Sequence, residues 1–206
     1  MLGVRSRIHD AAMRIFAETG GATVAVSDLA REAGLSRGTI YNNLAEPGRL
    51  FADVCEMMAE EIAQSVQASF VGVEDPAQRI ANIIRLCVRR VHEEPHWGRF
   101  VARYAMLEPT LGAFWGRAPA EELRRGLAAG RFDLRPEQTA SFAAAIGGTT
   151  FGAMTLVLHG VRTWREAGSD AAEMALRSIG LEREEARRLA RAGLPPLPRM
   201  SFPDAA

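Results

Sequence analysis

The sequence contains no lysine, so all 25 of its basic residues are arginine. Together with many alanines and 19 glycines, this bias is typical of a GC-rich genome and indicates no particular mechanism. Net charge is also absent, because 25 acidic residues balance the arginines. No bulk electrostatic field therefore draws the whole molecule onto nucleic acid, and nucleic-acid binding would require a local site.

Cysteine is scarce, and sustained alternation of apolar and polar residues is missing. The two cysteines, Cys55 and Cys87, fall within helical apolar patterns, which suits a reducing cytoplasm better than a disulfide framework. Residues 1–5 lead directly into charged positions without the apolar segment of a signal peptide, so we expect a cytoplasmic protein. Without strand-like alternation, 206 residues of 48% apolar composition should form an all-α fold of one or two domains.

Helical periodicity runs through the chain, and caps, prolines and glycines mark the helix ends. The first helix should stop at Gly20-Gly21, and a long fourth helix follows from apolar residues that repeat every four positions between Leu50 and Phe70. The stretch 109–119 contains prolines and glycines and is expected to be broken. The expected helices are residues 7–19, a second one capped by Ser27, a short third one opened by Ser36 and ending at 43, then 47–70, 76–94, 95–104, 120–129, 136–165, 170–179 and 183–192.

Residues 27–44 carry the pattern of a helix-turn-helix. Two short helices that cross steeply need a small residue at their contact and a turn residue free to adopt a positive φ. Ala30 meets the first need and Gly34 the second. The second helix of the pair presents no carboxylate outward, as a groove lined by phosphates requires. Its outward residues are Ser36, Arg37, Gly38, Thr39, Tyr41, Asn42 and Asn43.

A plain surface hairpin with a glycine turn is the alternative interpretation, but the pattern extends over eighteen residues with supporting helices on both sides. The run from Val26 to Tyr41, Val-Ser-Asp-Leu-Ala-Arg-Glu-Ala-Gly-Leu-Ser-Arg-Gly-Thr-Ile-Tyr, preceded by Ala12, Phe16 and Gly20, is similar to the signature of the TetR family. The specific match covers about the first fifty residues, and beyond them only the helical layout and the length agree.

The resemblance implies a three-helix DNA-binding domain at 1–48, a helical effector-binding and dimerisation domain at 49–194, and a flexible tail at 195–206. It implies a homodimer whose recognition helices enter successive major grooves of a palindromic operator in double-stranded DNA. A small-molecule effector would bind the C-terminal domain and release the DNA. We expect a repressor, with an activator or a regulator without a ligand as alternatives.

The resemblance also implies roles for individual side chains. Arg37, Thr39 and Asn42 are the candidates for contacts with base edges. The candidates for contacts with phosphates are Ser36, Tyr41 and Asn43, with Ser27 at the start of the preceding helix.

The chain departs from the family pattern just after this segment. The family usually has an aromatic residue followed by Ser-Lys-Glu, whereas this chain has Leu44 and then Glu46-Pro47-Gly48. The phosphate-facing lysine is missing, and Glu46 carries the opposite charge. We expect the Arg49 side chain, or the backbone amides of residues 48 and 49, to replace it.

The segment His92-Glu93-Glu94-Pro95-His96 matches the zinc-protease pattern His-Glu-x-x-His. That chemistry needs both imidazoles on one face of a continuous helix. Pro95 lies between them, removes a helical amide and disfavours the α conformation at Glu94. We therefore expect no metal, no cofactor and no enzymatic activity. A helical enzyme or sensor with a purely structural N-terminal segment is the alternative class.

Residues 141–161 contain no charged side chain and are long enough to span a bilayer. Small residues dominate the segment, His159 lies inside it, and no second span exists. We expect a buried central helix that also contributes to the dimer, not a membrane anchor. The dimer should combine the 136–165 helix and those after it in a four-helix bundle.

Aromatic and sulfur side chains of the C-terminal domain are the candidates for the lining of an effector cavity. Such residues at helical spacing are equally typical of a core. No charged side chain stands out as an anchor, which favours an apolar effector. The candidates are Trp97, Phe100, Tyr104, Trp115, Phe151 and Met154.

Overall fold

The protein is all-helical in the part of the chain that the structure describes. The structure is a computed structural model, and it describes residues 3–44 and 46–197. In these ranges there is no strand, and the helices are α1 (Val4–Thr19), α2 (Val26–Ala33), α3 (Arg37–Asn43), the 3-10 helix η1 (Pro47–Arg49), α4 (Leu50–Ala68), α5 (Pro76–Glu93), α6 (Pro95–Tyr104), α7 (Pro109–Ala128), the 3-10 helix η2 (Pro136–Gln138), α8 (Thr139–Leu158), α9 (Trp164–Ser178) and α10 (Arg183–Arg191).

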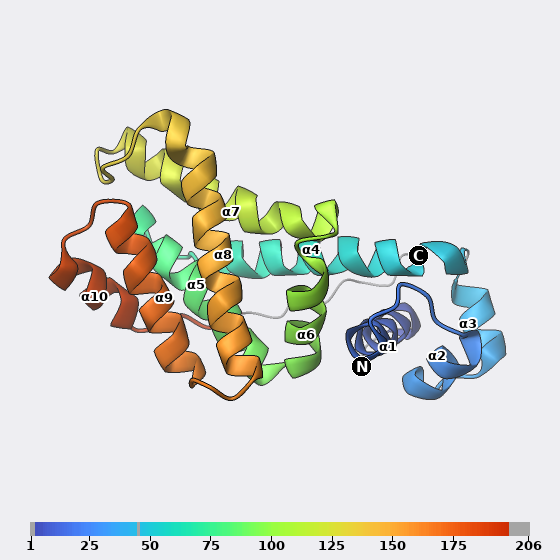
Figure 1. Ribbon diagram of the computed structural model, residues 1–206. Helices are drawn as coiled ribbons and strands as arrows, with labels where there is room; N and C mark the ends of the chain where they lie inside the picture. Colours follow the sequence, from blue (N-terminus) through green and yellow to red (C-terminus); the bar gives the residue numbers. More distant parts are fainter. Residues whose placement is uncertain (1–2, 45, 198–206) are drawn as a thin grey trace.

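The helices form a small head and a larger body (Figure 1). The head consists of α1, α2 and α3, which pack on one another through buried side chains such as Ile8, Phe16, Leu29 and Ile40. In the body, α5 packs against α7, α8, α9 and α10, and its apolar face is almost entirely buried. The long α4 contacts both α1 and α7, so it joins the two parts.

Helix α7 is continuous where the sequence predicts a broken segment. It runs from Pro109 to Ala128 with Pro119 inside it. A proline in a helix interior costs about 3 kcal/mol because it removes one hydrogen bond and clashes with the preceding turn. Burial of Leu111, Phe114 and Leu123 against the neighbouring helices offsets that cost. The prediction of an interruption at 109–119 was wrong because tertiary packing outweighs the local preference.

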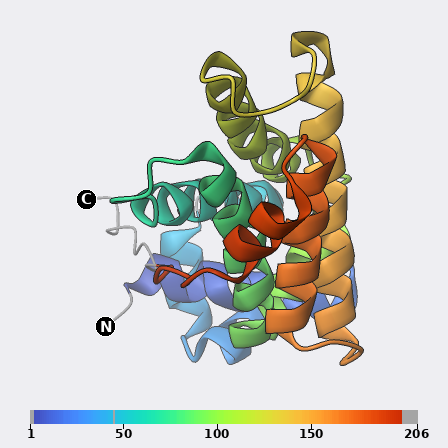
Figure 2. The same cartoon turned by 90° about the vertical axis from the view of Figure 1, so that its left-hand side faces the viewer.

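The helix predicted at 136–165 ends earlier than expected, and the helix predicted at 170–179 begins earlier. Helix α8 ends at Leu158, and Gly160 adopts a left-handed φ of 68° that turns the chain. Helix α9 then begins at Trp164, behind a capping box in which Thr163 and Glu166 bond each other's backbone amides. Helices α8 and α9 lie side by side along one edge of the body (Figure 2).

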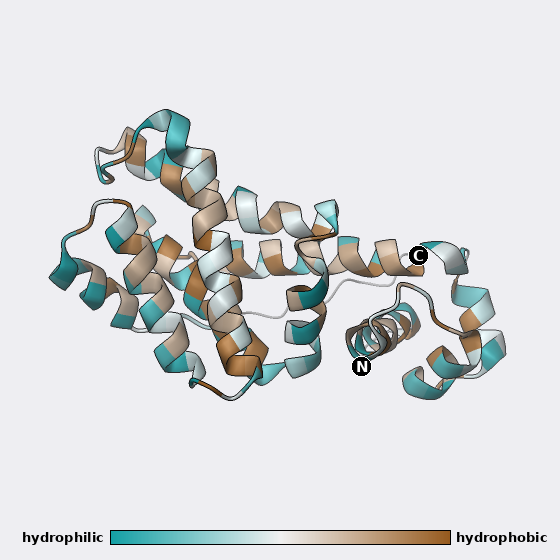
Figure 3. Ribbon diagram, viewed as in Figure 1, coloured by the Kyte–Doolittle hydropathy of each residue, from teal (hydrophilic) through white to brown (hydrophobic). Residues whose placement is uncertain are grey.

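Helix α8 is buried on one face and uncovered on the other in this single subunit. The segment Pro136–Leu158 is long and apolar enough to cross a membrane by length and composition, but only 33% of its apolar window is buried. A core helix of a soluble protein passes the same test. Figure 3 shows white to brown along most of α8, and its exposed residues include Ala144, Gly148, Gly152 and Leu156. In this single subunit the expected burial of the helix is found on one face, and its expected part in a dimer stays a prediction.

The predicted boundary of the tail at 195 falls near the end of α10, and its residues 198–206 lie outside the described residues.

Candidate nucleic-acid interface

Helix α3 is held at its N-terminus by the side chain predicted to open it. The Ser36 hydroxyl accepts a hydrogen bond from the Thr39 amide at 3.0 Å, so Ser36 is the N-cap. The Ser36 Oγ also lies 2.9 Å from the Thr39 Oγ1. On the inner side, Ile40 and Leu44 are buried against the rest of the head. The helix is therefore fixed on one side and open on the other.

The turn between α2 and α3 is fixed by an arginine that sequence reasoning missed. Gly34 adopts a φ of 63°, as predicted for the turn residue. The Arg7 Nη2 donates hydrogen bonds to the carbonyl oxygens of Ala33 at 2.7 Å and of Gly34 at 3.0 Å. No sequence pattern marks this contact, because its acceptors are backbone atoms 26 and 27 residues away. Arg7 thus ties the helix-turn-helix to α1.

The side chains predicted to contact DNA lie on the open side of α3, although they differ in how free they are. Arg37, Tyr41 and Asn42 are exposed, and the exposed fraction of Tyr41 is 62%. The Asn43 amide donates to the Thr39 carbonyl oxygen at 2.8 Å, so this group is engaged within the helix. The structure therefore brings the predicted residues together on one surface, but half of their polar groups already have partners.

Helix α2 begins two residues earlier than predicted. Its N-cap is Ala25, which has no side chain to bond the first amides, and Ser27 lies exposed in the first turn. Ser27 is thus not the N-cap. Its hydroxyl is in the region where free helix amides favour an anion, so its phosphate contact stays a prediction.

Arg49 and its neighbours occupy the position of the missing lysine. The Arg49 guanidinium lies 3.7 Å from the Asp53 carboxylate and 3.8 Å from that of Glu56. Exposed pairs of this kind contribute at most about 1 kcal/mol, so Arg49 can exchange them for a phosphate. The Arg49 amide donates to the Glu46 carbonyl oxygen at 2.9 Å and is not free. Of the predicted backbone donors, the Gly48 amide is the one without an acceptor among the described residues.

Two acidic residues of the head are paired with its own arginines. Residues 1–48 contain five arginines and five acidic residues. Arg31 pairs with Asp28 at 2.9 Å, and Arg14 lies 3.5 Å from Glu32. Among the described residues, no ion pair involves Arg37. The open surface of α3 therefore carries a positive charge although the head as a whole is neutral.

A cluster of aromatic side chains joins the head to the body. The Tyr104 hydroxyl lies 3.1 Å from the Phe16 carbonyl oxygen and 3.0 Å from the Gly21 carbonyl oxygen, both in the head. These two acceptors share its single proton. The Tyr104 ring contacts the rings of Phe51 and Phe100, with centroids 4.9 and 4.8 Å away. Two of the predicted effector-lining residues, Phe100 and Tyr104, thus lie at the contact between α6 and α1.

Charged and titratable groups surround the same contact. His9 on α1 is buried, and its ring Nδ1 lies 3.2 Å from the Met57 sulfur on α4. Burial lowers the pKa of His9, and nearby Arg5 lowers it further. Burial also raises the pKa of Asp10 on the same helix. Burial therefore disfavours the charged form of both groups at the packed contact between head and body.

The other predicted effector-lining residues lie deeper in the body. Trp115 on α7 meets Phe151 on α8 with ring centroids 4.6 Å apart, and Met154 is fully buried in the same helix. The Arg90 guanidinium covers the face of Trp97 at 4.5 Å, and Arg90 also pairs with Glu61. The indole nitrogens of both tryptophans are buried without a hydrogen-bond partner among the described residues.

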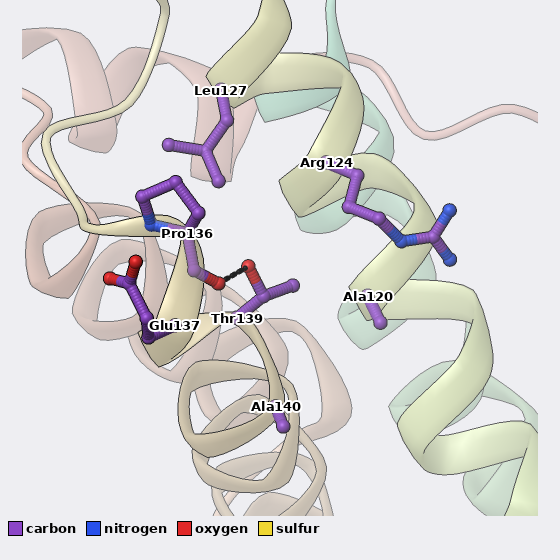
Figure 4. A pocket seen from close by; sticks show the side chains of 7 residues that line it. All are labelled: Ala120, Arg124, Leu127, Pro136, Glu137, Thr139 and Ala140. Atoms are coloured by element: carbon purple, nitrogen blue, oxygen red, sulfur yellow. Dashed lines mark hydrogen bonds between the residues drawn. The ribbon is translucent and has the colours of Figure 1, made fainter.

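A hollow of about 580 Å³ opens between α7 and the start of α8 (Figure 4). This end of the body lies away from the head (Figure 1). Its lining includes Leu127 and Pro136, and the Thr139 hydroxyl donates to the Pro136 carbonyl oxygen at 2.7 Å. Arg124 on its rim bonds Glu121 at 2.6 Å. None of the predicted effector-lining residues borders this hollow.

The two imidazoles of the zinc-protease pattern lie on separate helices. Helix α5 ends at Glu93, Glu94 has an extended φ of −132°, and Pro95 opens α6. Within residues 3–44 and 46–197, no group of three or more His, Cys, Asp or Glu side chains is arranged to hold a metal ion. The helix break at Pro95 agrees with the prediction.

Two family models match this chain. The model for bacterial regulatory proteins of the tetR family matches residues 8–43. The model for the tetracyclin repressor-like C-terminal domain matches residues 75–192. Together they cover the head and most of the body.

Curated relatives match part of the chain. It is 30% identical over 83 residues to the HTH-type transcriptional regulator AcrR of Shigella flexneri, which is 39% of this chain and 38% of AcrR. It is 26% identical over 106 residues to an uncharacterized HTH-type transcriptional regulator of Mycobacterium tuberculosis, which is 52% of this chain and 51% of that protein. The matched segments thus span no more than about half the length of these relatives.

Solved structures match nearly the whole chain. The structure of RolR in complex with resorcinol has a TM-score of 0.70 and 25% sequence identity, and the match covers 95% of this chain and 96% of RolR. The fatty acid degradation regulator FadR from Bacillus halodurans has a TM-score of 0.73 and 15% identity, covering 88% of this chain and 99% of FadR. At this identity the second likeness shows the fold alone.

Proposed function

The chain belongs to the TetR family of bacterial transcriptional regulators, and from that premise we propose that it is a repressor that occupies a palindromic operator as a homodimer. The observation that carries the proposal is the open surface of α3. It is rigidly held by α1 and α2, has no carboxylate, and presents Arg37, Tyr41 and Asn42 to the outside. Such a surface fits a major groove, whose walls are phosphates and whose floor offers hydrogen-bonding base edges.

For the base contacts we propose Arg37, Thr39 and Asn42. For the phosphate contacts we propose residues that surround this helix or precede it: Ser27, Ser36, Tyr41, Asn43 and Arg49. The Arg49 side chain would release its two carboxylate partners to do so, and the Asn43 amide would turn away from the Thr39 carbonyl oxygen. The head at 1–48 would be the DNA-binding domain, and 49–194 the effector-binding and dimerisation domain.

For the dimer we propose that α8 and α9 of two subunits form a four-helix bundle. Between Thr139 and His159 the exposed face of α8 has no charged residue, and a methyl group added at Gly148 or Gly152 would meet no neighbouring atom within 4 Å. A second backbone can therefore approach closely there. A dimer would place two heads side by side, as two half-sites of an operator require.

For the effector we propose a small apolar molecule that enters the body between α5, α7 and α8 and releases the DNA. RolR, which is similar to this chain over most of its length, was solved with resorcinol. The side chains offered to such a molecule are those of Trp115, Phe151 and Met154, with Trp97, Phe100 and Tyr104 nearer the head. The protein would act in the cytoplasm, without a metal, a cofactor or an enzymatic reaction.

The decisive experiment is selection of bound sequences from random double-stranded DNA by the purified full chain. The proposal expects an enriched inverted repeat, bound by one dimer in analytical ultracentrifugation. With Arg37 and Arg49 as the cationic side chains that each subunit brings to the DNA, log K against log salt should have a slope of roughly −2 to −4 for the dimer. Small molecules are then screened for loss of that binding. No enriched sequence, a slope near zero on the best sequence, or binding by a lone subunit would contradict the proposal.

A further inference from the structure

The hydrogen bonds inside α3 decide which groups are left to contact a base. The Ser36 hydroxyl oxygen accepts the Thr39 amide and lies 2.9 Å from the Thr39 hydroxyl oxygen. The Asn43 amide is bound to the Thr39 carbonyl oxygen. Ser36, Thr39 and Asn43 therefore form one internal network, whereas no internal hydrogen bond of Arg37 or Asn42 is present among the described residues.

The proposed contact of Ser36 with a phosphate determines where the Thr39 hydroxyl donates its proton. A hydroxyl has one proton to donate. When Ser36 donates its proton to a phosphate, the short contact between the two hydroxyls must be donated by Thr39. Thr39 then has no proton left for guanine or for the O4 of thymine, which are hydrogen-bond acceptors in the major groove. The Thr39 oxygen can still accept a hydrogen bond from the amino group of adenine or cytosine, but beside a thymine the methyl is the group of Thr39 that is left to make a favourable contact.

We propose that Thr39 recognises thymine through the 5-methyl group of that base, while its hydroxyl is retained by Ser36. This inference rests on the proposed function. Thymine is the only base that presents a methyl group in the major groove, and a threonine methyl is a suitable apolar partner for it. With 3.6 residues per turn, Asn42 and Gly38 lie opposite the buried Ile40, and Thr39 lies on the flank of that face. The contact is therefore made beside the centre of the recognition surface.

The first test removes the methyl from the DNA. Each thymine of the selected half-site is replaced in turn by deoxyuridine, which keeps base pairing and lacks only the 5-methyl group. At one position per half-site we expect an affinity loss of about fourfold for a single half-site, and about fifteenfold when both half-sites are changed, from the burial of one methyl group each. The other thymines should respond less.

The second test removes the methyl or the hydroxyl from the protein. Thr39→Val has the shape of threonine, keeps a methyl at that place and has no hydroxyl, so it should keep the deoxyuridine effect. Thr39→Ser keeps the hydroxyl and has no methyl, so it should lose the effect at that one position. Affinity for unrelated DNA and the thermal unfolding midpoint are measured for both variants as controls of folding.

The outcomes separate the two levels of the proposal. An enriched operator without a deoxyuridine-sensitive position, or without a thymine in the half-site, overturns the methyl contact and leaves the regulator intact. Loss of the effect in Thr39→Val together with its retention in Thr39→Ser shows contact through the hydroxyl and also overturns it. Absence of any enriched sequence overturns the proposed function and the contact together.

Discussion

Gly38 offers a test in which the stability of the protein and its affinity for DNA should change in opposite directions. It lies in α3 on the side opposite Ile40, and its backbone φ is not positive. A methyl group added there would meet only the Ser36 hydroxyl oxygen, at 3.7 Å, an ordinary contact distance. Nothing within the described chain therefore requires glycine at this position, although glycine in a helix is unfavourable.

Gly38→Ala should raise the free energy of unfolding by about 0.5–1 kcal/mol, because alanine loses less backbone entropy in a helix. The same methyl would project from the face that we propose enters the groove. A poorly fitting methyl in a close interface costs about 1–3 kcal/mol, so operator affinity should fall about fivefold or more per subunit. Urea unfolding measures the first effect, and titration of fluorescent operator DNA measures the second.

Gly116→Ala is the matched control, because Gly116 is exposed in α7 and has no atom within 4 Å of an added methyl. It should raise stability by a similar amount and leave operator affinity unchanged. If Gly38→Ala binds the operator as tightly as the unaltered protein, the assignment of this face to the groove is refuted.

Three further predictions concern the contact between head and body and the protein interior. Tyr104→Phe removes the hydroxyl shared by two head carbonyl oxygens and should lower the free energy of unfolding by about 1 kcal/mol in urea titrations; an unchanged value would show that this bond does not hold the head. Because burial lowers the pKa of His9, the unfolded chain binds its proton more readily, so stability should be complete above about pH 6.5 and fall as the pH drops below it. Replacement by His9→Gln should flatten that dependence, and an identical pH profile would contradict the reasoning. Burial raises the pKa of both Cys55 and Cys87 to about 12, so neither thiol should react with a disulfide reagent at pH 8 until the protein is unfolded, and rapid labelling of the native protein would refute this.

The boundary between α8 and α9 could have been predicted from the sequence. Gly160 followed by Thr163 and, three residues later, Glu166 is a helix stop followed by a capping box, and the structure uses both. Apolar residues continue at helical spacing on both sides of Gly160, so the periodicity alone predicts an uninterrupted helix there. In contrast, the continuity of α7 through Pro119 could not have been predicted locally, because it depends on helices far away in the sequence that bury its apolar residues.

The candidate site was predictable in its outline and not in its detail. The Ser36 cap, the Gly34 turn and the open surface of α3 follow from residue types and spacing. The hydrogen bonds that distinguish Asn43 from Asn42 do not, because both are asparagines on the same short helix. The role of Arg7 could not be predicted for a different reason. Its partners are main-chain carbonyl oxygens, which every residue type has, so the sequence does not mark them.

The pairing of acidic and basic side chains in the head has a consequence for how the protein would search a chromosome. Attraction to arbitrary DNA comes mainly from release of the cations that surround the phosphates, and a neutral head releases few of them. A genome offers a vast excess of such arbitrary sites. Weak binding to these arbitrary sites would leave most copies of the regulator unbound and free to reach the operator. A small number of molecules per cell would then suffice to keep the operator occupied.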